Sequence, residues 1–218
     1  MHDRRDSQQR HWEQTYTEKP EMFGEEPSVA ARAAAELFSH EGKTAILELG
    51  GGHGRDTLFF ARRGFRVTVL DYSAPGMASI TDKAKARGYV QTVTAMTHDV
   101  RQPLSLPNAS VDGCYSHMLF CMAMTTQEIE ALMREVWRVL RPGGLHVYTV
   151  RHTGDPHYGV GIHHSEDRYE TGGFEVHFFN REMIDHLTQG FELLGVEEFE
   201  EGSLPRRLYL VTLRKPEQ

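Results

Sequence analysis

The chain has 218 residues, a length that suits one domain with its own apolar core. Hydrophobic residues make up 39% and charged residues 25% of the sequence, which excludes a disordered chain. The formal net charge of −7 argues against a nucleic-acid partner or an anionic membrane surface. Only Cys114 and Cys121 occur, which excludes a disulfide framework, and no signal peptide or bilayer-spanning run is visible. We therefore expect one globular domain over 1–218, in the cytoplasm.

Predicted strands and helices alternate through the first two thirds of the chain. Apolar runs bounded by glycines and charged residues indicate the strands, and a period near 3.6 residues indicates the helices. We expect strands at 45–49, 65–70, 90–97, 111–117 and 145–150, and helices at 29–39, 55–63, 74–87 and 126–140. Such alternation predicts a parallel sheet with right-handed crossovers.

The last third of the chain carries a helix and two further strands. We expect the helix at 181–189 and the strands at 191–199 and 208–213. The connection over 200–207 is too short for a helical crossover, so the two final strands should pair antiparallel. Residues 151–180 then remain as an insertion with no assigned strand or helix.

A glycine-rich turn follows the first strand, where residues 46–54 read Ile-Leu-Glu-Leu-Gly-Gly-Gly-His-Gly. Glycines let backbone amides approach a ligand closely, and the next helix points its free N–H groups at the same place. The second strand ends in Asp71, whose carboxylate suits a ribose diol. The dinucleotide fingerprint is not met, because Arg55 stands where its third glycine would be. Glu48 suits an ammonium group and would repel a pyrophosphate.

The pattern Glu48-x-Gly50-x-Gly52-x-Gly54, followed by Asp71, resembles the nucleotide loop of class I S-adenosylmethionine-dependent methyltransferases. The methyltransferase-11/25-like members of that class are the nearest group. The resemblance implies S-adenosylmethionine as cofactor. It also implies a Rossmann-like α/β fold, a seven-stranded mostly parallel sheet with one antiparallel C-terminal strand and helices on both faces.

Five positions take cofactor roles by this resemblance. Asp71 would hold the ribose hydroxyls, and Tyr72 would pack on the adenine. Asp99 would accept from the adenine amino group, with the Val100 amide on the ring, although an Asp at a strand end is also a common turn residue. Ser116 opens the loop after the fourth strand, which faces the sulfonium and the acceptor.

The N-terminal arm, within residues 1–40, looks like the cap of tellurite-resistance and thiopurine-type methyltransferases. Trp12 and Tyr16 are its aromatic residues, followed by Phe23. In those proteins such an arm folds over the cofactor and the acceptor. The alternative is an amphipathic helix that packs on the sheet edge.

Many histidines and glycines lie in the insertion over 151–180. No recognised metal-ligand spacing occurs there, so we predict no metal site and interpret the segment as a mobile lid. The lid should close together with the arm over the acceptor. We expect the lid to contribute Tyr158, His163, His164 and Tyr169.

Three residues are candidates for general acid–base work. His117, at the end of the fourth strand, is the first candidate, and His152 and Tyr169 are the others. The alternative for His117 is a structural hydrogen bond that orients the loop. Cys121 could act as a thiolate towards a soft metalloid, but among apolar neighbours it is more often a buried small side chain.

The sequence therefore predicts an S-adenosylmethionine-dependent methyltransferase that acts on a small molecule. The resemblance of the arm favours a thiol, selenol or metalloid acceptor, which would need no general base. Two alternatives remain: a non-catalytic module that binds S-adenosylmethionine, and an NAD-dependent reductase, against which the missing third glycine argues. We expect a monomer or a homodimer.

Overall fold

A computed structural model of the chain describes residues 2–18, 24–202 and 206–217. Its main sheet has seven strands in the order β3-β2-β1-β4-β5-β10-β9. All are parallel except β10, which is antiparallel to both neighbours. The strands are β1 (Ala45–Leu49), β2 (Arg66–Asp71), β3 (Val93–Thr97), β4 (Val111–His117), β5 (Leu140–Arg151), β9 (Glu192–Glu201) and β10 (Arg206–Arg214).

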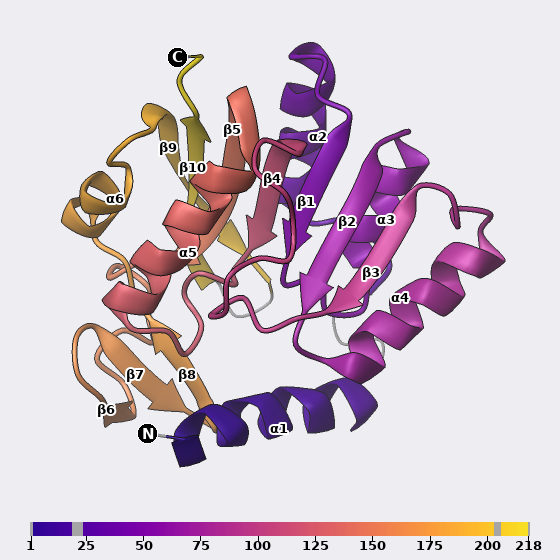
Figure 1. Cartoon of the computed structure of the whole chain (residues 1–218). Helices are drawn as coiled ribbons and strands as arrows, with labels where there is room; N and C mark the ends of the chain where they lie inside the picture. The colour runs from indigo at the N-terminus through magenta and orange to yellow at the C-terminus, as the bar shows by residue number, and fades with distance from the viewer. Residues whose placement is uncertain (1, 19–23, 203–205, 218) are drawn as a thin grey trace.

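Helices cover both faces of this sheet (Figure 1). Three of them, α2 (Val29–His40), α3 (Arg55–Arg62) and α4 (Ala74–Ala86), share one apolar core with the sheet. The other face packs against α5 (Thr126–Val139) and α6 (Arg181–Leu187) in a second core. The expected Rossmann-like arrangement is confirmed.

The sequence of α5 shows why these helices form. Thr125 and Glu128 make a reciprocal capping box at its start, with Glu128 N 3.2 Å from Thr125 Oγ1 and Thr125 N 2.9 Å from Glu128 Oε2. Apolar residues recur in it at helical spacing. Trp137 is exposed, whereas five of them are buried against the sheet: Ile129, Leu132, Met133, Val136 and Val139.

The register of the central strands brings their carboxyl ends to one edge. Leu49 of β1 pairs with Leu70 of β2 on one side and with Ser116 of β4 on the other. The residues that follow these strands therefore meet at the same edge, as expected for parallel strands. Helix α1 (His2–Glu18) crosses beneath this edge (Figure 1).

A second, three-stranded sheet lies beside α1 (Figure 1). It consists of β6 (Ile162–His163), β7 (Arg168–Thr171) and β8 (Phe174–His177), all antiparallel. Gln8 of α1 joins the two elements, since its Nε2 donates to Gly173 O at 2.8 Å and its Oε1 accepts from Glu175 N at 3.3 Å. The arm and the insertion thus meet, as the sequence led us to expect.

Most predicted boundaries lie within one or two residues of those in the structure, and three features differ by more. The insertion over 151–180 is not a bare loop, because it forms the small sheet. Strand β5 begins at Leu140 and runs through the predicted break at 141–144, where Gly143 adopts φ +70° and the pairing with β4 shifts register. Strand β3 begins only at Val93, because a turn that Thr92 N closes on Tyr89 O (3.0 Å) precedes it.

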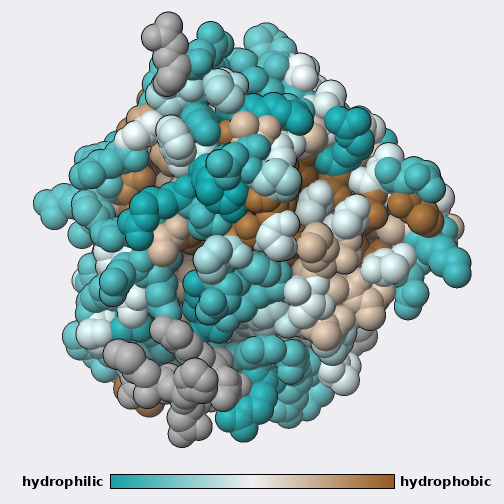
Figure 2. Space-filling model, in the orientation of Figure 1, coloured by the Kyte–Doolittle hydropathy of each residue, from teal (hydrophilic) through white to brown (hydrophobic). Residues whose placement is uncertain are grey.

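Most of the surface seen in Figure 2 is hydrophilic, and apolar residues show mainly between α5 and the α4 side of the sheet. None of the described helices is long and apolar enough to cross a membrane.

Candidate active site

The glycine-rich turn after β1 adopts a conformation that other residues would not tolerate. Gly50, Gly52 and Gly54 have φ values of +77°, +53° and +84°. Position 51 has no room for a side chain, because a Cβ at Gly51 would lie 2.2 Å from Val69 Cγ2. The turn therefore presents bare backbone to the space beyond the strand ends.

Glu48 is a buried carboxyl beneath this turn, with 3% of its surface exposed. Its Oε2 accepts from the Thr57 hydroxyl. Burial, together with the negative charge of Asp56 nearby, raises the pKa of Glu48 to about 8. A ligand that brings a positive charge would relieve this penalty, so the site fits an ammonium group.

Asp71, at the end of β2, holds the glycine turn in place. Its Oδ2 accepts from Gly52 N and its Oδ1 from Ser73 N, both at 2.9 Å. Burial raises the pKa of Asp71, although the two backbone hydrogen bonds oppose that shift. Tyr16 of α1 and Tyr72 also have raised pKa values, because both are buried close to the Asp71 carboxylate. Each carboxylate oxygen can accept more than one hydrogen bond, so Asp71 can also bind a ribose diol.

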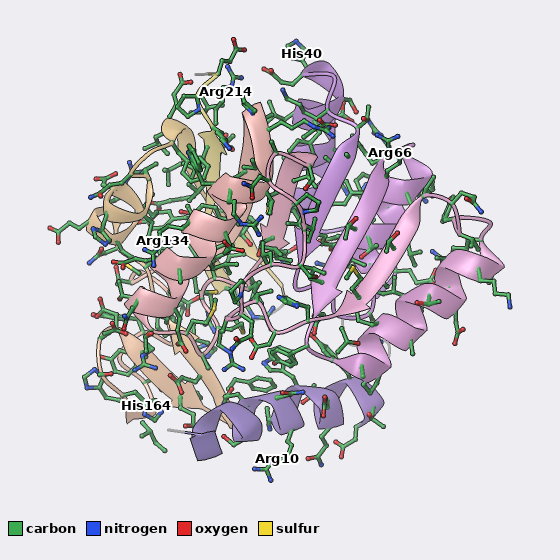
Figure 3. All side chains as sticks on the ribbon, viewed as in Figure 1. Arg10, His40, Arg66, Arg134, His164 and Arg214 are labelled. Atoms are coloured by element: carbon green, nitrogen blue, oxygen red, sulfur yellow. The ribbon has the colours of Figure 1, made fainter. Side chains whose placement is uncertain are left out.

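A cleft of about 600 Å³ opens at the carboxyl edge of the main sheet. The glycine turn, the ends of β2 and β4, α1 and the small sheet all line it. Figure 3 shows side chains that project from α1 towards the strand ends, whereas Arg10 points away from them. Of the residues predicted from the sequence, the cleft brings together Trp12, Tyr16, Glu48, Gly50, Gly52, Asp71, Tyr72, His117 and Tyr169. Gly54 lies behind this lining, as the N-cap residue of α3.

Asp99 and Val100 line a smaller pocket that adjoins the cleft at Trp12, Tyr72, Leu119 and Met122. The Asp99 carboxylate binds the guanidinium of Arg101 through both oxygens, with contacts of 2.8–3.1 Å. These hydrogen bonds outweigh burial and lower the pKa of Asp99. The resemblance assigns Asp99 and Val100 to adenine binding. That role stays a prediction, because the adenine ring would have to reach this pocket.

Ser116 and His152 also lie away from the cleft. Ser116 is fully buried, and its hydroxyl has no hydrogen-bond partner within the described part of the chain. His152 stacks on Tyr209 at 4.4 Å, and its Nδ1 accepts from Gly154 N at 3.0 Å. Because side chains alternate along a strand, the cleft receives Arg151 rather than His152 from the end of β5. We therefore withdraw His152 as a catalytic candidate.

His117 lies in the cleft with both ring nitrogens engaged. Its Nδ1 is 2.9 Å from Thr149 Oγ1, and its Nε2 is 2.9 Å from Glu201 Oε2. The hydrogen bond from His117 helps to lower the pKa of Glu201 against the effect of burial. The next residue, Met118, has φ +61°, a left-handed conformation that is uncommon for a side chain of this size. Such strain fixes the direction in which the chain leaves β4.

Of the four lid residues predicted from the sequence, Tyr169 lines the cleft and the other three do not. Tyr158 donates to Asp167 at 2.8 Å, and His163 stacks on Tyr169 at 4.7 Å. Figure 3 places His164 at the outer edge of the small sheet. None of these three lines the cleft, while Phe174, Val176 and Phe178 do, together with Tyr169, Thr171 and His157. Phe23 lies outside the described residues.

The spacing of the newly found lid residues was visible in the sequence. Phe174, Val176 and Phe178 alternate with polar residues, which is typical of a strand with one apolar face. Arg151 and Arg206 had no such signal, because only the pairing of β5 with β10 brings them to the cleft.

Cys121 is a buried thiol rather than a thiolate. Burial raises its pKa to about 11, and its Sγ donates to Met118 O at 3.2 Å. In the described part of the chain, no three or more His, Cys, Asp or Glu side chains lie together in a way that could hold a metal ion.

The fold is similar to that of known methyltransferases. Residues 46–144 match the family described as "Methyltransferase domain". A solved structure of the Burkholderia thailandensis 1,6-didemethyltoxoflavin-N1-methyltransferase, with its substrate and S-adenosylhomocysteine bound, has a similar fold. The TM-score is 0.76 at 18% identity, over 99% of this chain and 90% of the other.

Two curated relatives match at higher identity over shorter stretches. The malonyl-[acyl-carrier protein] O-methyltransferase of Serratia marcescens is 31% identical over 53% of this chain and 41% of its own length. The human thiol S-methyltransferase TMT1B is 33% identical over 56% of this chain and 51% of its own length. The chain thus spans about half the length of these relatives, or less. Residues 46–144 therefore match a methyltransferase domain, and the whole chain has the fold of a structure that holds S-adenosylhomocysteine.

Proposed function

We propose that this protein transfers the methyl group of S-adenosylmethionine to a small molecule bound in the cleft. The observation that carries the proposal is the buried Glu48 carboxyl beneath the glycine turn, at the same edge of the sheet as Asp71. A dinucleotide would place a pyrophosphate on this turn, against a carboxyl group. The zwitterionic methionine part of S-adenosylmethionine places an ammonium there instead.

The residues of the cleft fit this cofactor. Glu48 would hold the ammonium, Asp71 the ribose hydroxyls, and the rings of Tyr16 and Tyr72 the adenosine part. When bound, the cofactor supplies a methyl group activated by a sulfonium leaving group. The chain itself needs only to orient the acceptor and exclude water.

Helix α1 and the small sheet together cover the cleft, and this cover favours a small acceptor. Trp12 of α1 packs on Phe174 of β8 with ring centroids 4.8 Å apart, so the two elements form a continuous cover. We also propose that this cover acts as a lid. It would open to admit the acceptor and to release the product.

A thiol is the acceptor class that we favour. The arm resembles that of thiopurine-type enzymes, and a thiol S-methyltransferase is among the relatives. The acceptor sulfur would form a bond to the methyl carbon as the carbon–sulfonium bond breaks, and the thiol proton would pass to the His117–Glu201 pair. His117 remains the candidate base, although the proton that Nε2 donates to Glu201 must first pass to that carboxylate, so that Nε2 can accept.

The test is product formation from S-adenosylmethionine and a panel of small thiols, selenols and hydroxyl compounds, read by mass spectrometry. We expect S-adenosylhomocysteine and a methylated acceptor from the wild type. The Glu48→Gln variant should lose this activity, and Glu197→Gln, an exposed change of the same type on β9, should retain it. If the protein binds S-adenosylhomocysteine but methylates nothing in the panel, the non-catalytic binding module becomes the better account.

A further inference from the structure

We propose that the acceptor carries an anionic group, such as a carboxylate, which binds at an anion site made by Arg151, His157 and Arg206. This inference deepens the proposed function and rests on it, because it concerns the acceptor side of the same cleft. All three side chains line the cleft, and none belongs to the glycine turn or to the strand ends beside Asp71.

Arg151 is a buried guanidinium held in one orientation. Its side chain is only 9% exposed, and its Nε and Nη2 both donate to the Asp155 carboxylate. Its guanidinium carbon lies over the Phe178 ring, 5.2 Å from the centroid. Asp155 is fixed in turn, because it also accepts from His157 N at 2.8 Å and Arg207 N at 2.9 Å.

One edge of this guanidinium has no partner. Nη1 donates a hydrogen bond to no group in the described part of the chain. The fully buried side-chain nitrogen and oxygen atoms that lack a hydrogen-bond partner do not include it. It therefore retains accessible surface, and because Arg151 lines the cleft, we infer that Nη1 faces it. A buried and pre-oriented N–H pair of this kind is suited to an anion.

His157 adds a second donor. Arg151 Nη2 lies 2.7 Å from His157 Nδ1, and a guanidinium can only donate, so Nδ1 is the acceptor. The ring proton of the neutral imidazole then sits on Nε2, which makes no hydrogen bond to the described residues. His157 thus offers an N–H from the same wall of the cleft.

Arg206 supplies the charge. Asp155 neutralises Arg151, but Arg206, at the start of β10, has no ion-pair partner among the described residues. Glu201, the one acidic residue of the lining on this side, is the cross-strand partner of Arg206, but its carboxylate accepts a hydrogen bond from His117 Nε2 at 2.9 Å. The opposite side of the cleft contains three carboxyl groups, Glu48, Asp56 and Asp71, and one cation, Arg55. The two sides therefore differ in charge, which suits a cationic cofactor on one and an anionic acceptor on the other.

The test compares 3-mercaptopropionate with 3-mercaptopropionamide, two probes that differ in charge but hardly in shape. Ligand-observed NMR would measure the dissociation constant of each, with and without saturating S-adenosylhomocysteine. We expect the acid to bind at least about tenfold more tightly than the amide, the effect of one charge-assisted hydrogen bond.

The matched variants are Arg206→Ala and Arg207→Ala. Both remove one positive charge at adjacent positions of β10, but Arg207 binds Glu200 and Gly154 O outside the cleft. We expect Arg206→Ala to weaken binding of the acid about tenfold and to leave the amide unchanged, and Arg207→Ala to change neither. The double change Arg151→Gln with Asp155→Asn, which removes the buried pair together, should also abolish the preference for the acid.

Equal binding of the two probes, binding of neither, or equal effects of the two single variants would overturn the anion site. The affinity for S-adenosylhomocysteine, measured on the same samples, separates this failure from failure of the proposed function. Cofactor binding without any preference for the acid removes only the anion site, and a preference for the acid without cofactor binding removes only the methyltransferase assignment.

Discussion

Replacement of Glu48 by Gln should abolish a proton release that accompanies cofactor binding. In the free protein the pKa of Glu48 is raised to about 8 by burial and by Asp56. At pH 7 this carboxyl therefore carries a proton in about nine molecules of ten. An incoming ammonium stabilises the ionised form, so binding should release about 0.9 proton per ligand at pH 7.

Isothermal titration calorimetry with S-adenosylhomocysteine measures this release directly. The apparent binding enthalpy at pH 7, compared between buffers of different ionisation enthalpy, gives the number of protons. We expect release from the wild type and from the Glu197→Gln control, and almost none from Glu48→Gln. Proton release that is absent from the wild type, or that persists in Glu48→Gln, would refute the reasoning.

The same group makes the stability of the free protein depend on pH. The pKa of Glu48 in the folded state lies above its ordinary value of 4.5, so its stabilising contribution is complete below pH 4.5 and is lost as pH rises through 8. The loss is on the order of 5 kcal/mol, the free energy that corresponds to a pKa change from 4.5 to about 8. Denaturation of Glu48→Gln should therefore show a gain in stability relative to the wild type that grows between pH 5 and pH 9. A constant difference over that range would contradict the assigned pKa.

Three further predictions follow from the cleft. Asp71→Ala should weaken the affinity for S-adenosylhomocysteine at least about tenfold and also lower the melting temperature, because two backbone hydrogen bonds are lost; an unchanged affinity in calorimetry would mean that the carboxylate serves only the turn. Residues 10–18 and 152–175 should gain protection together in hydrogen exchange when S-adenosylhomocysteine binds, and the lid idea fails if neither segment responds. If His117 accepts the acceptor proton, His117→Gln should lower the rate for a hydroxyl acceptor more than for a thiol, and equal losses would assign it a purely positioning role.

The parallel strands and their order of appearance could be predicted because each carries a local signal. The apolar run before Gly50 and the one before Asp71 are bounded by turn residues, and parallel pairing then places both ends at one edge. For the same reason the glycine turn, Glu48 and Asp71 could be expected at one edge of the sheet, where the cleft lies. Asp71 was expected only to bind the cofactor. Its hydrogen bonds from Gly52 N and Ser73 N, which hold the glycine turn, could not be inferred, because residue spacing does not indicate them.

The acceptor side was less predictable because it depends on contacts between distant segments. Histidine content drew attention to His152, His163 and His164, none of which lines the cleft. Arg151 and Arg206 reach it through the pairing of β5 with β10, which joins positions more than fifty residues apart. No local pattern records such a pairing.

The central claim is that the glycine turn and Glu48 bind S-adenosylmethionine rather than a dinucleotide. Calorimetric titration of the wild-type protein with S-adenosylhomocysteine and, separately, with NADH tests it most directly. The account predicts saturable one-to-one binding of S-adenosylhomocysteine and no binding of NADH. Binding of NADH without binding of S-adenosylhomocysteine would contradict it.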